Sequence, residues 1–154
     1  MVSAVGGTGN YLIADNEITC GYVNSAGIRL HSNSAAAPIT RAVVVNNNVT
    51  MQSSGNFGSE SAGIELRRAC TNTCVIDNVI SGGARAALAL IAEPGLIPGL
   101  NTLVLEWRVD FDASVAYLFI GADPAGIGTS KTIVVREPSS IEDHGSGTVI
   151  IPRP

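Results

Sequence analysis

One asparagine recurs at the same place in three similar segments, and its spacing constrains the fold more than any other feature of the chain. The interval from Asn16 to Asn47 is equal to the interval from Asn47 to Asn78. Each asparagine is followed two positions later by an aliphatic residue and three positions later by Thr or Ser. A fixed period of about 20 to 50 residues is typical of structures built from stacked units. The repeat therefore predicts that segments one period apart lie on top of one another.

The pattern continues beyond the third asparagine, with less regularity. The three regular segments are Ile13–Thr19, Val44–Thr50 and Val75–Ser81. A fourth, Val104–Asp110, begins slightly less than one full period after the third and has Trp107 where the asparagine is expected. A fifth is recognisable around Ile133–Arg136 only by its β-branched residues.

A second set of five segments alternates with the first. These segments are Ala26–Leu30, Ala62–Leu66, Ala86–Leu90, Ala116–Ile120 and Gly147–Ile151. Each has aliphatic residues at its third and fifth places, which is the period of a strand with one buried face. The two sets are separated by stretches of variable length, so we expect constant strands joined by surface loops. Residues 92–100 are predicted to be a loop insertion.

Such short strands cannot bury an apolar face alone, whereas stacked copies can. Stacking predicts two inner columns of like side chains. The first column is Ile28, Ile64, Leu88, Leu118 and Val149, and the second is Leu30, Leu66, Leu90, Ile120 and Ile151. The three asparagines are predicted to form an inward ladder at a bend, because a buried amide is tolerated only when it is hydrogen-bonded.

These segments resemble the repeats of right-handed parallel β-helix proteins of the pectate-lyase-like superfamily. The resemblance extends from about Tyr11 to Ile151 and is clearest up to Leu90. It implies an all-β fold, a right-handed single-stranded parallel β-helix (a solenoid) of about five coils, with residues 1–154 as one domain. A helical solenoid would need a 3.6-residue period, and a β-sandwich would not explain the repeated asparagine.

The family resemblance says less about function, since proteins of this shape include polysaccharide lyases and hydrolases, phage tailspikes and adhesins. It implies a secreted or cell-surface location, although residues 1–10 lack the basic and apolar regions of a signal peptide. The net charge of −4 argues against nucleic-acid binding. The sequence contains no run of 18 apolar residues, so no membrane-spanning segment is predicted.

Four polar residues on the second set of strands are the best site candidates. Alternation places Arg29 and His31 on the outer face of one strand, and Glu65 and Arg67 on the next. Stacking then puts Arg29 beside Glu65, and His31 beside Arg67. Arginine forks bind carboxylates, so this patch predicts a site for an acidic saccharide. The interpretation favoured over this one is a solvated strand face whose Arg29–Glu65 pair contributes roughly 0.2–1 kcal/mol.

The same residues are the only catalytic candidates, and they are weak ones. Elimination chemistry would use Arg67 or His31 as base, with Glu65 as a further polar group. Glycoside hydrolysis needs two carboxylates around one bond, and besides Glu65 only Glu60 could approach. The favoured function is a non-catalytic module for binding, scaffolding or assembly, with carbohydrate as the ligand class. The alternative is a small polysaccharide lyase or glycoside hydrolase that acts on an acidic polysaccharide.

Other acidic residues give at most a weak cation site, so we predict no metal and no cofactor. Asp15, Glu17 and Asp77 flank the expected ladder. A charged outer strand is the better interpretation of Glu106, Asp110 and Asp112 near Trp107. Cys70 and Cys74 could form a short disulfide loop, but two buried or half-buried thiols are favoured.

The outer positions of the later strands are unusually apolar, which predicts self-association. Alternation would expose Ala87, Ala89, Ile91, Tyr117, Phe119 and Ile150. An exposed apolar column of this length needs a cover, either residues 92–100 or another subunit. No amphipathic capping helix is predicted at either end, which also fits a piece of a longer solenoid.

Overall fold

β-Strands are the only regular secondary structure among the described residues of this chain. The structure, a computed structural model, describes residues 2–5, 10–21, 25–34, 36–52, 61–68, 70–91, 103–105, 108–121, 133–135, 141–144 and 148–151. Of these, 3–5, 84–85, 103–135, 142 and 150 are described by their backbone alone. Within these ranges, all strand pairings are parallel. No helix in this part of the chain is long and apolar enough to cross a membrane.

Sixteen strands make up the described part. They are β1 (Val2–Val5), β2 (Tyr11–Ala14), β3 (Glu17–Cys20), β4 (Ala26–Ser32), β5 (Ile39–Thr40), β6 (Ala42–Val45), β7 (Asn48–Met51), β8 (Ala62–Arg68), β9 (Cys70–Thr71), β10 (Cys74–Ile76), β11 (Val79–Ile91), β12 (Leu103–Leu105), β13 (Arg108–Gly121), β14 (Ile133–Val135), β15 (Ile141–Asp143) and β16 (Val149–Ile151).

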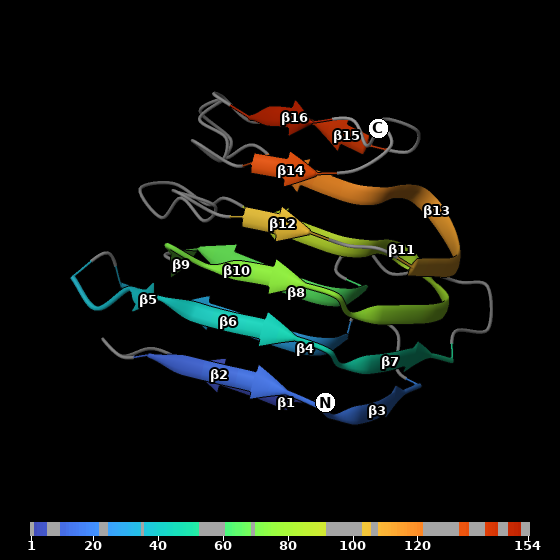
Figure 1. Cartoon of the computed structure of the whole chain (residues 1–154), viewed down its shortest axis with the longest axis horizontal. Helices are drawn as coiled ribbons and strands as arrows, with labels where there is room; N and C mark the ends of the chain where they lie inside the picture. Colours follow the sequence, from blue (N-terminus) through green and yellow to red (C-terminus); the bar gives the residue numbers. More distant parts are fainter. Residues whose placement is uncertain are drawn as a thin grey trace.

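The strands belong to three parallel sheets. An eight-stranded sheet has the order β1-β4-β8-β11-β13-β15, with β7 paired to the long strand β11 and β3 paired to β7. A six-stranded sheet has the order β16-β14-β12-β10-β6-β2, and β5 pairs with β9. The strands are stacked in sequence order from the blue N-terminal end to the red C-terminal end (Figure 1). Between neighbouring strands of one sheet, the chain passes through another sheet.

The first set of repeats forms the six-stranded sheet in the predicted register. Ile13 pairs with Val44, Val44 with Val75, and Val75 with Val104, so the two equal steps and the shorter third step are confirmed. The fifth segment is also confirmed, because Val134 of β14 pairs with Val104 of β12. Val44 and Val75 are fully buried.

The asparagine ladder at the end of these strands is confirmed as well. The side-chain amide of Asn16 donates to Oδ1 of Asn47 at 2.8 Å, and that of Asn47 donates to Oδ1 of Asn78 at 2.8 Å. The residue before each ladder member has a left-handed backbone, with φ of 56°, 54° and 52° at Asp15, Asn46 and Asp77. Asp and Asn adopt this conformation more readily than other non-glycine residues. Each of the three repeats therefore has a bend in the backbone directly before its ladder asparagine.

The second set of repeats is confirmed in four of its five segments. Ile28, Ile64, Leu88 and Leu118 are in register across β4, β8, β11 and β13. The assignment of Val149 and Ile151 to the same columns is wrong. Those residues belong to β16, which pairs with β14 in the six-stranded sheet.

Two strands of the eight-stranded sheet have no counterpart among the predicted segments. Ile141 of β15 pairs with Leu118, in the place expected for Val149. At the other end, Val2 of β1 pairs with Ile28. β15 reads Ile-Glu-Asp and so lacks the second aliphatic residue of the pattern, whereas β1 is too short to show alternation beside its glycine-rich neighbours.

Candidate functional site

The four predicted site residues lie on two adjacent strands in the predicted register. Arg29 of β4 pairs with Glu65 of β8, and His31 pairs with Arg67. The intervening residues of each strand, including Leu30 and Leu66, are fully buried in the core. Because side chains alternate along a strand, the four polar residues project from the opposite face of the sheet.

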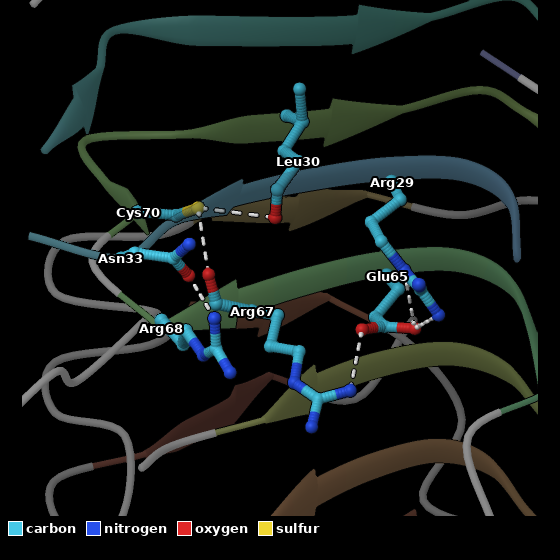
Figure 2. Close-up of polar contacts among 7 residues, drawn as sticks. All are labelled: Arg29, Leu30, Asn33, Glu65, Arg67, Arg68 and Cys70. Atoms are coloured by element: carbon cyan, nitrogen blue, oxygen red, sulfur yellow. Dashed lines mark hydrogen bonds and ion pairs between the residues drawn. The ribbon is translucent and has the colours of Figure 1, made fainter. Parts of the chain in front are cut away.

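A carboxylate between two guanidinium groups is the centre of this site. Nε and Nη2 of Arg29 donate to Oε2 of Glu65 at 3.2 and 2.8 Å. Nη1 of Arg67 lies 3.7 Å from Oε1 of the same carboxylate. Figure 2 shows the Glu65 carboxylate with Arg29 on one side and Arg67 on the other.

The Glu65 side chain is buried, so the patch around it is not the solvated strand face described in the sequence analysis. The Glu65 side chain has no exposed surface, although it lies on the outer face, and those of Arg29 and Arg67 are 20% and 18% exposed. Two long arginine side chains converge on one carboxylate, and a buried charge is tolerated only when it is paired in this way. The three side chains are therefore a fixed structural element, and the two guanidinium groups carry more charge than Glu65 neutralises.

A pocket of about 280 Å³ opens beside this group. Arg29, His31, Arg67 and Arg68 line it. All four are donors or cations, and the Glu65 carboxylate lies beneath two of them. The pocket therefore has the chemistry of an anion site, since guanidinium forks bind carboxylate, sulfate and phosphate groups.

Arg68 is the pocket residue that the sequence pattern missed. Strict alternation after Arg67 would turn Arg68 towards the core. The backbone at Arg68 is instead left-handed, with φ of 63°, and its guanidinium donates to Oδ1 of Asn33 (Figure 2). Two consecutive arginines at the end of a predicted strand were the available signal, because a strand end is where alternation stops.

Cys70 lies directly behind the pocket strands and is a buried thiol. Its Sγ donates to the carbonyl oxygens of Leu30 and Arg67 at 3.3 and 3.4 Å. The pKa of Cys70 is raised to about 12, mainly by burial; the hydrogen bond to the Arg67 backbone works against this rise and the nearby Glu65 carboxylate adds to it. Cys70 and Cys74 are both free, so the interpretation as two thiols is confirmed.

The weaker candidates do not form a site among the described residues. Oδ1 of Asp15 accepts from the side-chain amide of Asn46 at 2.6 Å, at the exposed bend. No group of three or more His, Cys, Asp or Glu able to hold a metal occurs in the part of the chain that the structure describes. Asp110 and Asp112 lie on β13, in register with Ser81 and Gly83. Glu60, Glu106, Trp107 and the insertion 92–100 lie outside the described residues.

Of the apolar column predicted on the outside of β11, Ala87 and Ala89 are buried and Ile91 is partly exposed. Ala87 is fully buried and Ala89 is 4% exposed. Ala87 packs in the main core, and Ala89 packs with Ala62 and Ala86. Ala89 keeps the regular register, in line with Glu65 of β8, so its burial is not a failure of alternation.

Fold and site together define a class: an all-β chain of stacked parallel strands with a basic pocket on the outer face of its largest sheet. Comparison with known proteins adds no closer assignment. No family model, curated protein or solved structure matches the chain.

Proposed function

We propose that this chain is a right-handed parallel β-helix that serves as a non-catalytic binding module for acidic saccharides. The observation that carries this proposal is the pocket lined by Arg29, His31, Arg67 and Arg68, which holds three guanidinium groups. Glu65 forms ion pairs with two of them and is fully buried. The surface that a ligand would meet is thus lined by cations and an imidazole, a composition that suits an acidic ligand.

The path of the chain between the sheets supports the solenoid part of this proposal. Successive strands of the six-stranded sheet are one repeat apart in the sequence, and the chain visits the eight-stranded sheet in between. Parallel strands joined by such crossovers are right-handed in nearly all proteins. The aligned asparagine ladder and the aligned Ile and Leu columns are what identical coils would produce.

A carboxylated sugar is the ligand class that best fits the pocket. Its volume of about 280 Å³ suits a single sugar unit better than an extended cofactor. Arg67 and Arg68 are adjacent in sequence and both face the pocket, so a planar carboxylate could bind with two-pronged hydrogen bonds. The neighbouring strands continue the same face, where further units of a chain could lie.

Binding without catalysis is favoured because the site's carboxylate is inaccessible. Glu65 has no exposed surface and is hydrogen-bonded to Arg29, so it is not positioned to take a proton from a ligand. The alternative, a small polysaccharide lyase, would depend on His31 or Arg67 as base. Release of unsaturated uronates from a polyuronate panel would show that chemistry by ultraviolet absorbance, and would replace the binding proposal.

Calorimetric titration with oligogalacturonate, and with a neutral oligosaccharide of equal length, tests the proposal. We expect binding of the acidic ligand only, weakening as salt is added. Replacement of Arg68 by glutamine should lower the affinity about tenfold or more, since a hydrogen bond to a charged group contributes roughly 1.5–3 kcal/mol. Arg67→Gln should have a similar effect.

Arg41→Gln is the matched control for Arg68→Gln. Arg41 is also an arginine with a left-handed backbone, with φ of 54°, but it lies on an exposed bend and does not line the pocket. We expect its replacement to leave the affinity unchanged. Equal binding of neutral and acidic sugars, or an equal loss in both variants, would refute an acidic-saccharide site at the pocket.

A further inference from the structure

Of the four residues that line the pocket, His31 is the one whose charge can change near neutral pH. A guanidinium group has a pKa of roughly 12 or more, so a positive charge is always present on Arg29, Arg67 and Arg68. An imidazole ordinarily titrates at about pH 6.5. A ligand in the pocket therefore meets three cations when His31 is neutral and four when it is protonated.

The neighbours of His31 within its sheet carry more positive than negative charge. Arg67 of β8 pairs with His31 on one side, and Val5 of β1, a strand without titratable side chains, pairs with it on the other. Along β4, Arg29 is the nearest charged residue on the same face. The only carboxylate on β1, β4 and β8 is Glu65, which is already paired with both of these arginines. A bound anion would thus add the negative charge that His31 lacks.

The other strands in contact with β4 bring no further titratable group into the pocket. These strands are β3, β5, β7 and β9, and their titratable residues are Glu17 and Cys20 on β3 and Cys70 on β9. Glu17 is exposed and in register with Asn48 of β7. Both cysteines are buried thiols in the core, and the pKa of about 12 keeps Cys70 uncharged near neutral pH. His31 is therefore the titratable group of the pocket among the described residues.

We propose that anion binding at the pocket is coupled to protonation of His31, so that the pocket takes up a proton as it fills. This coupling would regulate the saccharide site and rests on the function proposed above. A negative charge within about 4–6 Å favours the charged form of an imidazole. Because linkage is reciprocal, the factor by which a bound anion raises the proton affinity of His31 is also the factor by which the proton raises the anion affinity.

The sign of the effect is that acid tightens binding. The anion affinity is highest below the titration range of His31 in the free protein, and it falls as the pH rises through the titration range of His31 in the complex. We expect a factor of about tenfold, the lower end for such close pairs, because His31 is partly exposed to solvent.

A titration of the two imidazoles by nuclear magnetic resonance, with inorganic sulfate as the probe, tests the coupling without any saccharide. The chain has two histidines, and His144 is exposed and does not line the pocket, so it is a control within the same sample. Relative to sodium chloride of equal ionic strength, sulfate should move the titration midpoint of His31 upward by about one pH unit and leave that of His144 unchanged. Arg68→Gln should reduce the effect of sulfate on His31. No movement at His31, or equal movement at both imidazoles, would overturn the coupling.

Calorimetry with oligogalacturonate separates this coupling from the saccharide proposal. Its carboxylates stay ionised between about pH 5.5 and 8, so a change in affinity over this range comes from the protein. Wild-type protein should bind about tenfold more tightly at the lower pH, and His31→Gln should bind equally at both. Equal binding by wild-type protein at both pH values would refute the coupling and leave the saccharide site in place. No saccharide binding at either pH, with the sulfate effect on His31 intact, would remove the saccharide proposal and support the coupling.

Discussion

Replacement of Asn47 by alanine is expected to lower the free energy of unfolding by about 3–5 kcal/mol. The Asn47 side chain is 1% exposed and makes five hydrogen bonds. It donates to Asn78 and to the carbonyl oxygens of Ile13 and Val45, and it accepts from the backbone and side-chain nitrogens of Asn16. Alanine leaves several of these buried partners unsatisfied, at about 1–3 kcal/mol each for those that cannot find water.

Asn48→Ala is the control for this substitution, measured in the same urea titration. Asn48 is the next residue along the chain, begins β7 and is exposed. Its replacement should change the free energy of unfolding by less than about 0.5 kcal/mol. If the two variants lost equal stability, the ladder would not be the stabilising element described above.

The second large effect is expected for Gly63→Ala, where β8 passes close to two neighbours. A Cβ atom at this position would lie 2.7 Å from the carbonyl oxygen of Ala87 and 2.5 Å from Cγ2 of Ile80. The first of these atoms belongs to the backbone of β11 and cannot move without breaking the sheet register. Overpacking of this kind costs about 1–3 kcal/mol, and we expect the upper end of that range.

Gly21→Ala separates this steric effect from the general effect of removing a glycine. The nearest atoms to a Cβ at Gly21 are at 3.8 and 4.0 Å, both on Gln52, which is ordinary contact. Gly21→Ala should therefore be neutral or slightly stabilising in thermal unfolding, because alanine reduces the entropy of the unfolded chain. A Gly63→Ala protein as stable as Gly21→Ala would show that β8 and β11 are not packed this closely.

The parts of the fold that sequence could predict are those in which one residue type is required at one place. A buried amide at a bend needs amide neighbours above and below, so Asn16, Asn47 and Asn78 repeat without variation. The pairing of Arg29 with Glu65 and of His31 with Arg67 was predicted separately, by aligning the aliphatic third and fifth places of the second set of segments. All of these pairings are confirmed.

Other features depend on the three-dimensional surroundings of a residue rather than on its type, and the alternation of side chains along a strand could not predict them. Glu65 is outward by pattern yet buried, and it forms ion pairs with Arg29 and Arg67. Arg68 reaches the pocket only through a left-handed backbone at the end of β8. At the C-terminal end, Gly147–Ile151 carries the aliphatic spacing of one sheet but pairs in the other, since any outward-facing aliphatic pair gives the same pattern.

The prediction of an exposed apolar column failed for the same reason, because alternation does not show which outward residues are covered. Alternation predicted it on β11, where Ala87 and Ala89 are buried. Leu12, Val149 and Ile151, which are exposed, lie on the six-stranded sheet instead, where strands of only three or four residues are aliphatic on both sides. Such short runs do not show which side is inward until their partners are known.

The central claim is that residues one repeat period apart are nearest neighbours. The most direct test is to measure nuclear Overhauser contacts from the side-chain amide protons of Asn47. In uniformly labelled protein these protons should exchange slowly with solvent and show contacts to the side-chain amide of Asn78 and to the backbone at Ile13. Rapid exchange, with contacts only to residues adjacent in sequence, would contradict the stacked arrangement and the pocket that depends on it.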